Sequence, residues 1–130
     1  MEMTITFPGE MRVDAESGSL SITTNQDGTA PTPFALFLAS MGTCAGIYVV
    51  GFCKQRAIPY EDIRIIQRME TNPITRMIES VELDIQLPPN FPEQYKSAVI
   101  RAAELCAVKK HLEAPPVFDV HTSTFEIAAG

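Results

Sequence analysis

The sequence predicts an α+β fold in which two helices pack on antiparallel sheet. Three observations lead to it. A run of 26 residues without charge extends from Gly28 to Cys53, short alternating segments lie on both sides of it, and an amphipathic stretch follows later in the chain. In chain order the pattern indicates three strands, a helix, two strands, a second helix and a final strand.

The chain has 130 residues, which predicts one domain over residues 1–130. Its 45% hydrophobic and 20% charged residues are typical of a globular protein. The formal net charge is −6 and the basic residues are scattered, which argues against a nucleic-acid surface. The N-terminal residues lack a basic segment followed by an apolar one, so we expect a cytoplasmic protein.

Turn residues divide the part before the uncharged run into three short segments. Breaks at Pro8-Gly9 and Ser17-Gly18 predict a β-meander over residues 1–7, 10–15 and 19–25.

After the run, residues 62–71 and 74–87 are predicted to form two strands joined at Asn72-Pro73. The second helix is expected to begin near Pro92 and to continue through Cys106. Residues 117–128 are expected to form the final strand.

The first helix has a clear beginning. Thr32 is a suitable N-cap, and Pro33 stands at the first helical position, where its missing N–H costs nothing. The predicted helix runs from about Thr32 to Arg56. A helix that is apolar all round is either a core element or a membrane span.

A membrane span needs about 20 apolar residues, a length that this run reaches. Ser40, Thr43 and three glycines interrupt it, and no Trp or Lys anchor precedes it. We therefore expect a helix enclosed by protein. Gly42 and Gly46 are four residues apart, so a second helix, such as one from a partner subunit, could approach this side closely.

Three cysteines form no CxxC pair, which predicts free thiols in a reducing compartment. An inward cysteine such as Cys44 is either core filler or a placed reactive group. Cys53 lies nine residues later, on the opposite helical face, and is interpreted as filler. Cys106 is expected to point inward from the second helix. A zinc site of Cys44, Cys106 and His111 is an alternative, but its spacings fit no compact ligand motif.

Two cysteine-bearing segments resemble the OsmC/Ohr family of organic hydroperoxide reductases. The string PTPFALFLASMGTC resembles the start of that family's central helix, and RAAELCAVKKHL resembles its second-cysteine segment. FPGEMRVDA is similar to the N-terminal hairpin of its OsmC-like members. The resemblance implies an intertwined homodimer whose central helices are enclosed by sheets from both chains.

The resemblance also implies thiol-dependent reduction of organic hydroperoxides in oxidative or osmotic stress defence. Cys44 would be the peroxidatic residue, Cys106 the resolving residue and Arg12 the thiolate-stabilising cation. The implied partners are an organic hydroperoxide, a small dithiol or dihydrolipoyl protein as reductant, and a second copy of the chain. No cofactor, metal, nucleic acid or membrane is expected.

The sequence departs from the family at one position. Ohr-type members carry a glutamate near the start of the central helix, where it holds the arginine, whereas Phe34 and Ala35 stand there in this chain. Glu10 and Glu70 are the substitutes that we consider for this role.

Two further function classes stay open. The first is a non-catalytic protein on the same scaffold, which binds a small hydrophobic ligand or senses redox state. The second is a membrane-associated protein.

Overall fold

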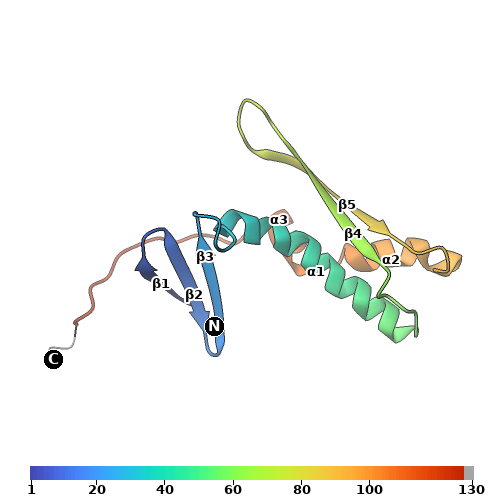
Figure 1. Cartoon of the computed structure of the whole chain (residues 1–130), viewed down its shortest axis with the longest axis horizontal. Coiled ribbons are helices and arrows are strands. Elements are labelled where there is room, and N and C mark those ends of the chain that lie inside the picture. The colour runs from blue at the N-terminus through green and yellow to red at the C-terminus, as the bar shows by residue number, and fades with distance from the viewer. Residues whose placement is uncertain (128–130) are drawn as a thin grey trace.

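A computed structural model describes residues 1–127. The expected mixed α+β architecture is present, with N-terminal antiparallel strands, a long helix, a hairpin and further helices (Figure 1). The strands are β1 (Thr4–Gly9), β2 (Arg12–Ser17), β3 (Leu20–Asn25), β4 (Arg64–Thr71) and β5 (Ile78–Gln86). The helices are α1 (Pro33–Gln55), the 3-10 turn η1 (Glu93–Tyr95), α2 (Lys96–Ala103) and α3 (Ala107–Glu113).

The N-terminal strands form the expected meander, in the order β1-β2-β3 with antiparallel pairing throughout. The central strand β2 places Asp14 opposite Thr6 on one side and Thr23 on the other. An irregularity between Thr6 and Gly9 shifts the register at the end of β1, where Pro8 has no N–H to donate.

Helix α1 begins as the sequence predicts. The Thr32 hydroxyl accepts a hydrogen bond of 3.1 Å from the N–H of Ala35, and Pro33 occupies the first helical position. The helix ends after Gln55, where the N–H of Arg56 bonds back to the carbonyl of Cys53. Both ends lie within one residue of the predicted bounds.

One face of α1 forms the centre of the core. Ala45, Val49, Phe52 and Cys53 are buried there, and they join Val99 of α2 in one apolar cluster. A close packing of this kind supplies most of the stability of a helix in a small protein.

Strand β4 occupies the space beside the two helix glycines. A Cβ on Gly42 would lie 2.5 Å from Oε1 of Gln67, and one on Gly46 would lie 3.9 Å from Cδ1 of Ile65. Gln67 also donates to the carbonyl of Leu38 at 2.8 Å. The close approach expected from the glycine spacing is therefore made by a strand of the same chain, and not by a second helix.

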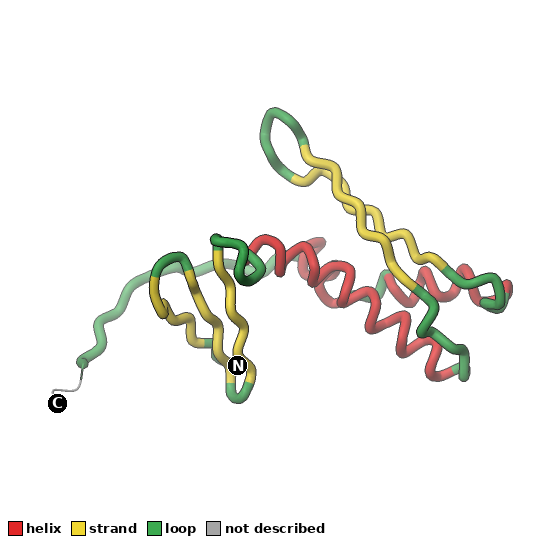
Figure 2. The backbone as a smooth tube through the Cα atoms, in the orientation of Figure 1, coloured by secondary structure: helices red, strands yellow, loops and turns green. Residues whose placement is uncertain are grey.

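The long β4–β5 hairpin extends beyond the helices (Figure 2). Its turn is organised by Asn72, whose side-chain oxygen accepts hydrogen bonds from the N–H groups of Ile74 and Thr75. The predicted junction at Asn72-Pro73 is thus correct.

The second helix differs from the prediction. A single helix through Cys106 was expected, but α2 ends at Ala103 and a separate helix, α3, begins at Ala107. Cys106 stands between them in a non-helical conformation (φ −48°, ψ 126°), and its carbonyl accepts the hydrogen bond from the N–H of Lys110 that opens α3. No glycine or proline marks this break, so the helical spacing of apolar residues through Cys106 predicted one continuous helix.

The predicted final strand is wrong for residues 117–127, which form no strand. Ala128 lies outside the described residues. This segment leaves the helices as an extended chain (Figure 1), with Val117 at 97% and Val120 at 91% exposure. A strand needs a neighbouring edge for its N–H and C=O groups, and none of the five described strands pairs with it.

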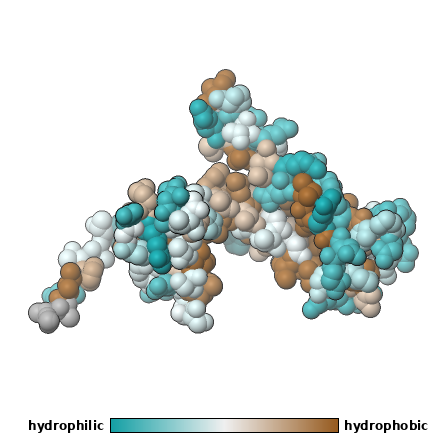
Figure 3. All heavy atoms as spheres, in the orientation of Figure 1, coloured by the Kyte–Doolittle hydropathy of each residue, from teal (hydrophilic) through white to brown (hydrophobic). Residues whose placement is uncertain are grey.

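Helix α1 is not enclosed on all sides within one chain. Apolar side chains such as Phe34 and Ile47 are exposed on it at 56% and 63%, and brown side chains are visible along it in Figure 3. By length and composition alone α1 could cross a membrane. Its packing against α2, α3 and β4 is that of a core helix.

Candidate functional site

The fold brings Cys44 and Cys106 together. Cys44 is partly exposed in the middle of α1, and Cys106 is 2% exposed at the start of α3. The two thiols lie close enough for each to shift the pKa of the other, and all three cysteines are free thiols. Residues 62 positions apart in sequence therefore form one dithiol site, because α3 packs across the middle of α1.

The surroundings of Cys44 favour its thiolate. The backbone N–H of Val108, the thiol of Cys106 and the backbone N–H of Ala107 are directed at its sulfur and lower the pKa of Cys44, while partial burial opposes them. These N–H groups belong to the first turn of α3, where backbone donors lack helical partners. Hydrogen bonds to the charged form of an acid lower its pKa.

The same contact has the opposite effect on Cys106. Burial raises the pKa of Cys106, and its hydrogen bond to Cys44 raises it further. The pKa of Cys44 is therefore the lower of the two, and Cys44 loses its proton before Cys106 does.

Cys53 lies apart from this pair. It is fully buried on the core face of α1, and burial raises the pKa of its thiol. A protonated thiol without access to solvent is unreactive, as the interpretation of Cys53 as filler requires.

Arg12 occupies β2 and does not act on Cys44 within one chain. Its guanidinium binds Asp14 through two hydrogen bonds, from Nε to Oδ1 at 3.0 Å and from Nη2 to Oδ2 at 2.9 Å. Asp14, and neither Glu10 nor Glu70, is therefore the carboxylate that holds Arg12. The sequence contained this signal as an Arg-Val-Asp triplet, since residues i and i+2 of a strand share one face.

No cation of the described chain shifts the pKa of Cys44, whose donors are all N–H and S–H groups. Lys109 and His111 follow Cys106 on α3, but His111 directs Nδ1 at the carbonyl of Ala107, 2.7 Å away. Within residues 1–127 no three His, Cys, Asp or Glu side chains gather closely enough to hold a metal ion.

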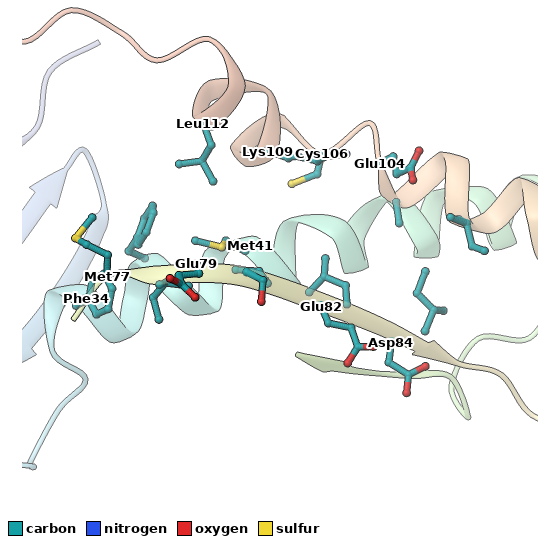
Figure 4. A pocket seen from close by; sticks show the side chains of 18 of the residues that line it. Phe34, Met41, Met77, Glu79, Glu82, Asp84, Glu104, Cys106, Lys109 and Leu112 are labelled. Carbon is teal, nitrogen blue, oxygen red and sulfur yellow. The ribbon is translucent and has the colours of Figure 1, made fainter. Parts of the chain in front are cut away.

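A groove of about 920 Å³ leads to the dithiol from the Cys106 side. Figure 4 shows it between β5 and the helices, with Phe34 and Met41 contributed by α1 and Leu112 by α3. Cys106 lies on its wall, beside Lys109. An apolar groove beside a dithiol can hold the hydrocarbon part of a small molecule.

Residues 26–121 match the family model described as OsmC-like protein. No curated protein matches the chain.

Solved structures share the fold at low identity. A Psychrobacter arcticus protein assigned to the osmotic stress and detoxification response has a TM-score of 0.68 at 17% identity, with 83% of this chain and 85% of that chain covered. The OsmC-like protein of Mycoplasma pneumoniae has a TM-score of 0.61 at 15% identity, with 88% of this chain and 87% of that chain covered. The organic hydroperoxide resistance protein OhrB of Bacillus subtilis has a TM-score of 0.56 at 17% identity, with 88% of this chain and 93% of that chain covered.

Replacing Cys106 should change the reactivity of Cys44. In Cys106→Ala the Cys44 sulfur loses the thiol of residue 106 as a hydrogen-bond donor. The pKa of Cys44 therefore rises, and its alkylation by iodoacetamide at pH 7 slows. Cys106→Ser keeps an O–H donor and is expected to stay closer to the parent protein. Mass spectrometry of the alkylated Cys44 peptide, measured across a range of pH, gives the pH midpoint of Cys44 alkylation for each variant. Identical midpoints in Cys106→Ala and the parent would contradict the donor role.

Proposed function

Because the chain belongs to the OsmC-like protein family, we propose that it reduces organic hydroperoxides with Cys44 as the peroxidatic residue and Cys106 as the resolving residue. The proposal is supported by the proximity of the two thiols, each of which shifts the pKa of the other, with Cys44 the more acidic. Oxidative or osmotic stress defence is the role that this activity would serve.

The proposed cycle uses three steps. The Cys44 thiolate attacks the distal oxygen of ROOH, so that an S–O bond forms, the O–O bond breaks and the alkoxide leaves and takes up a proton as ROH. Cys106 then attacks the sulfur of the Cys44 sulfenic acid, which forms the disulfide and releases water. A dithiol finally reduces the disulfide by exchange and is itself oxidised to a disulfide.

The described geometry suits this order of roles. Cys44 is partly exposed and has the lowered pKa that a nucleophilic thiol needs. Cys106 is buried beside it and keeps its proton until the sulfenic acid forms. The apolar groove supports an organic peroxide over hydrogen peroxide, because burial of a hydrocarbon tail contributes about 0.8 kcal/mol per CH₂.

The reductant is proposed to be a small dithiol or a dihydrolipoyl protein in the cytoplasm. Free thiols without a disulfide partner suit a reducing compartment.

A second copy of the chain is proposed to complete the site with Arg12. In one chain the Cys44 thiolate has hydrogen-bond donors but no cation, while Arg12 lies on a sheet that has only marginal contact with the described helices. A guanidinium beside the sulfur would stabilise its negative charge.

Exposed apolar surface supports the same homodimer. The three-stranded sheet, the outer face of α1 and the extended segment 115–127 leave side chains such as Phe37, Phe118 and Phe125 uncovered. A three-stranded sheet needs an apolar face packed on something to be stable. Sheets and helices of two intertwined chains would cover one another.

A hydrophobic ligand is the second candidate, favoured by the volume of the groove. In that case Cys44 and Cys106 would sense redox state or merely line the site. Peroxide consumption separates the two functions.

The reduced protein should consume cumene hydroperoxide faster than hydrogen peroxide. Cys44→Ser is expected to abolish consumption because no other thiolate is poised to attack. Cys106→Ser is expected to complete one turnover and stop at the sulfenic acid, which dimedone labels. Cys53→Ser serves as the control and should match the parent. Undiminished consumption by Cys44→Ser would contradict the catalytic assignment.

Mixed dimers should show which chain supplies Arg12. The Arg12→Ala and Cys44→Ser proteins are each expected to be nearly inactive. When an equal mixture of the two is refolded, half of the dimers are heterodimers. In each heterodimer one of the two sites has both Cys44 and Arg12, and the other has neither. The mixture should therefore recover about a quarter of the parent activity. If Arg12 served the Cys44 of its own chain, the mixture would stay inactive while the parent refolded alone recovered fully.

A further inference from the structure

The Arg12–Asp14 pair has unequal exposure. The Asp14 side chain is 7% exposed, whereas that of Arg12 is 47% exposed. An exposed arginine ordinarily samples many rotamers, and an exposed ion pair contributes little to stability. Here the carboxylate lies in the central strand of the sheet, fixed by backbone pairing on both sides. The more rigid member therefore determines where the guanidinium lies.

Asp14 stays ionised while it makes this contact. The hydrogen bonds from Arg12 lower the pKa of Asp14 against the effect of burial, and a hydrogen bond from Thr23, its neighbour on β3, adds to this. A carboxylate that is largely withdrawn from water is stable only when paired.

The fork geometry leaves part of Arg12 available. Asp14 engages Nε–H and one N–H of Nη2, so the other edge of the planar guanidinium, including Nη1, keeps its donors. Those donors face away from the carboxylate and can bind an anion. A guanidinium held on one edge and open on the other has its direction fixed before the anion arrives.

We propose that Asp14 is a positioning residue, which aims the free edge of Arg12 at the Cys44 thiolate. This rests on the proposed peroxidase function and on Arg12 as its cation. Asp14 touches neither the sulfur nor the peroxide and acts only through Arg12. It also accounts for an active cysteine on a helix that carries no carboxylate of its own.

The direction of one pKa change distinguishes positioning from simple charge. Removing the Asp14 charge takes an anion away from the neighbourhood of Cys44, which by electrostatics alone would lower the pKa of the thiol. Losing the orientation of Arg12 removes a cation from the sulfur and raises that pKa. The two effects have opposite signs.

Asp14→Asn, Asp14→Glu and the matched control Glu16→Gln test the proposal. Glu16 is exposed two residues along the same face of β2. Two measurements are made in each variant: the alkylation midpoint of Cys44 against pH, and turnover with cumene hydroperoxide.

Asp14→Asn is expected to move the midpoint to higher pH and to reduce turnover on the order of tenfold or more. Asp14→Glu keeps the charge and should recover part of the loss, while Glu16→Gln should match the parent. In an Arg12→Ala background, Asp14→Asn should cause no further loss of turnover and no further rise of the midpoint, since the positioning effect acts through Arg12. Urea unfolding of each variant checks that it is folded.

Unchanged turnover in Asp14→Asn, or a midpoint moved to lower pH, would overturn the positioning role and leave the peroxidase proposal standing. A further loss in the Arg12→Ala background would overturn it as well. If Asp14→Asn does not fold, the Asp14→Glu variant decides, because its longer side chain moves the carboxylate: parental turnover together with a parental midpoint would overturn the role. A parent protein that consumes no cumene hydroperoxide would instead overturn the proposed function, and the positioning role with it.

Discussion

The packing of the first turn of α3 against Cys44 is the interaction on which this site depends. Helix α1 carries no charge between its first residue and Lys54, so it cannot stabilise a thiolate by itself. Donors must come from another element, and the N–H groups of Val108 and Ala107 and the thiol of Cys106 supply them. The break between α2 and α3 places these donors beside Cys44, so the pKa of a cysteine on an uncharged helix is lowered.

Local sequence signals were sufficient for much of the fold. Thr32 and Pro33 marked the start of α1, and turn residues marked the meander and the hairpin, because caps and turns are determined by their own residues. The break before Cys106 was missed because no Gly or Pro marks it. A non-helical backbone at Cys106 lets α3 turn back onto α1, and only the tertiary packing shows this. The strand expected over 117–128 does not form over residues 117–127, because a strand needs a partner edge and the described strands of one chain do not provide it.

The candidate site was predictable only in part. Resemblance to the family indicated Cys44, Cys106 and Arg12, whereas periodicity alone would have left each cysteine as core filler. Asp14 was overlooked, because a carboxylate two residues from an arginine on a strand is ordinarily a solvated face. Its burial in the central strand separates it from that ordinary case.

Peptide mapping after one equivalent of cumene hydroperoxide tests whether Cys44 and Cys106 form one redox pair. We expect a disulfide between Cys44 and Cys106 of the same chain, with Cys53 still a free thiol and the chain migrating as a monomer on a non-reducing gel. Recovery of Cys44 as an unmodified thiol, or as a disulfide to any other cysteine, would contradict it.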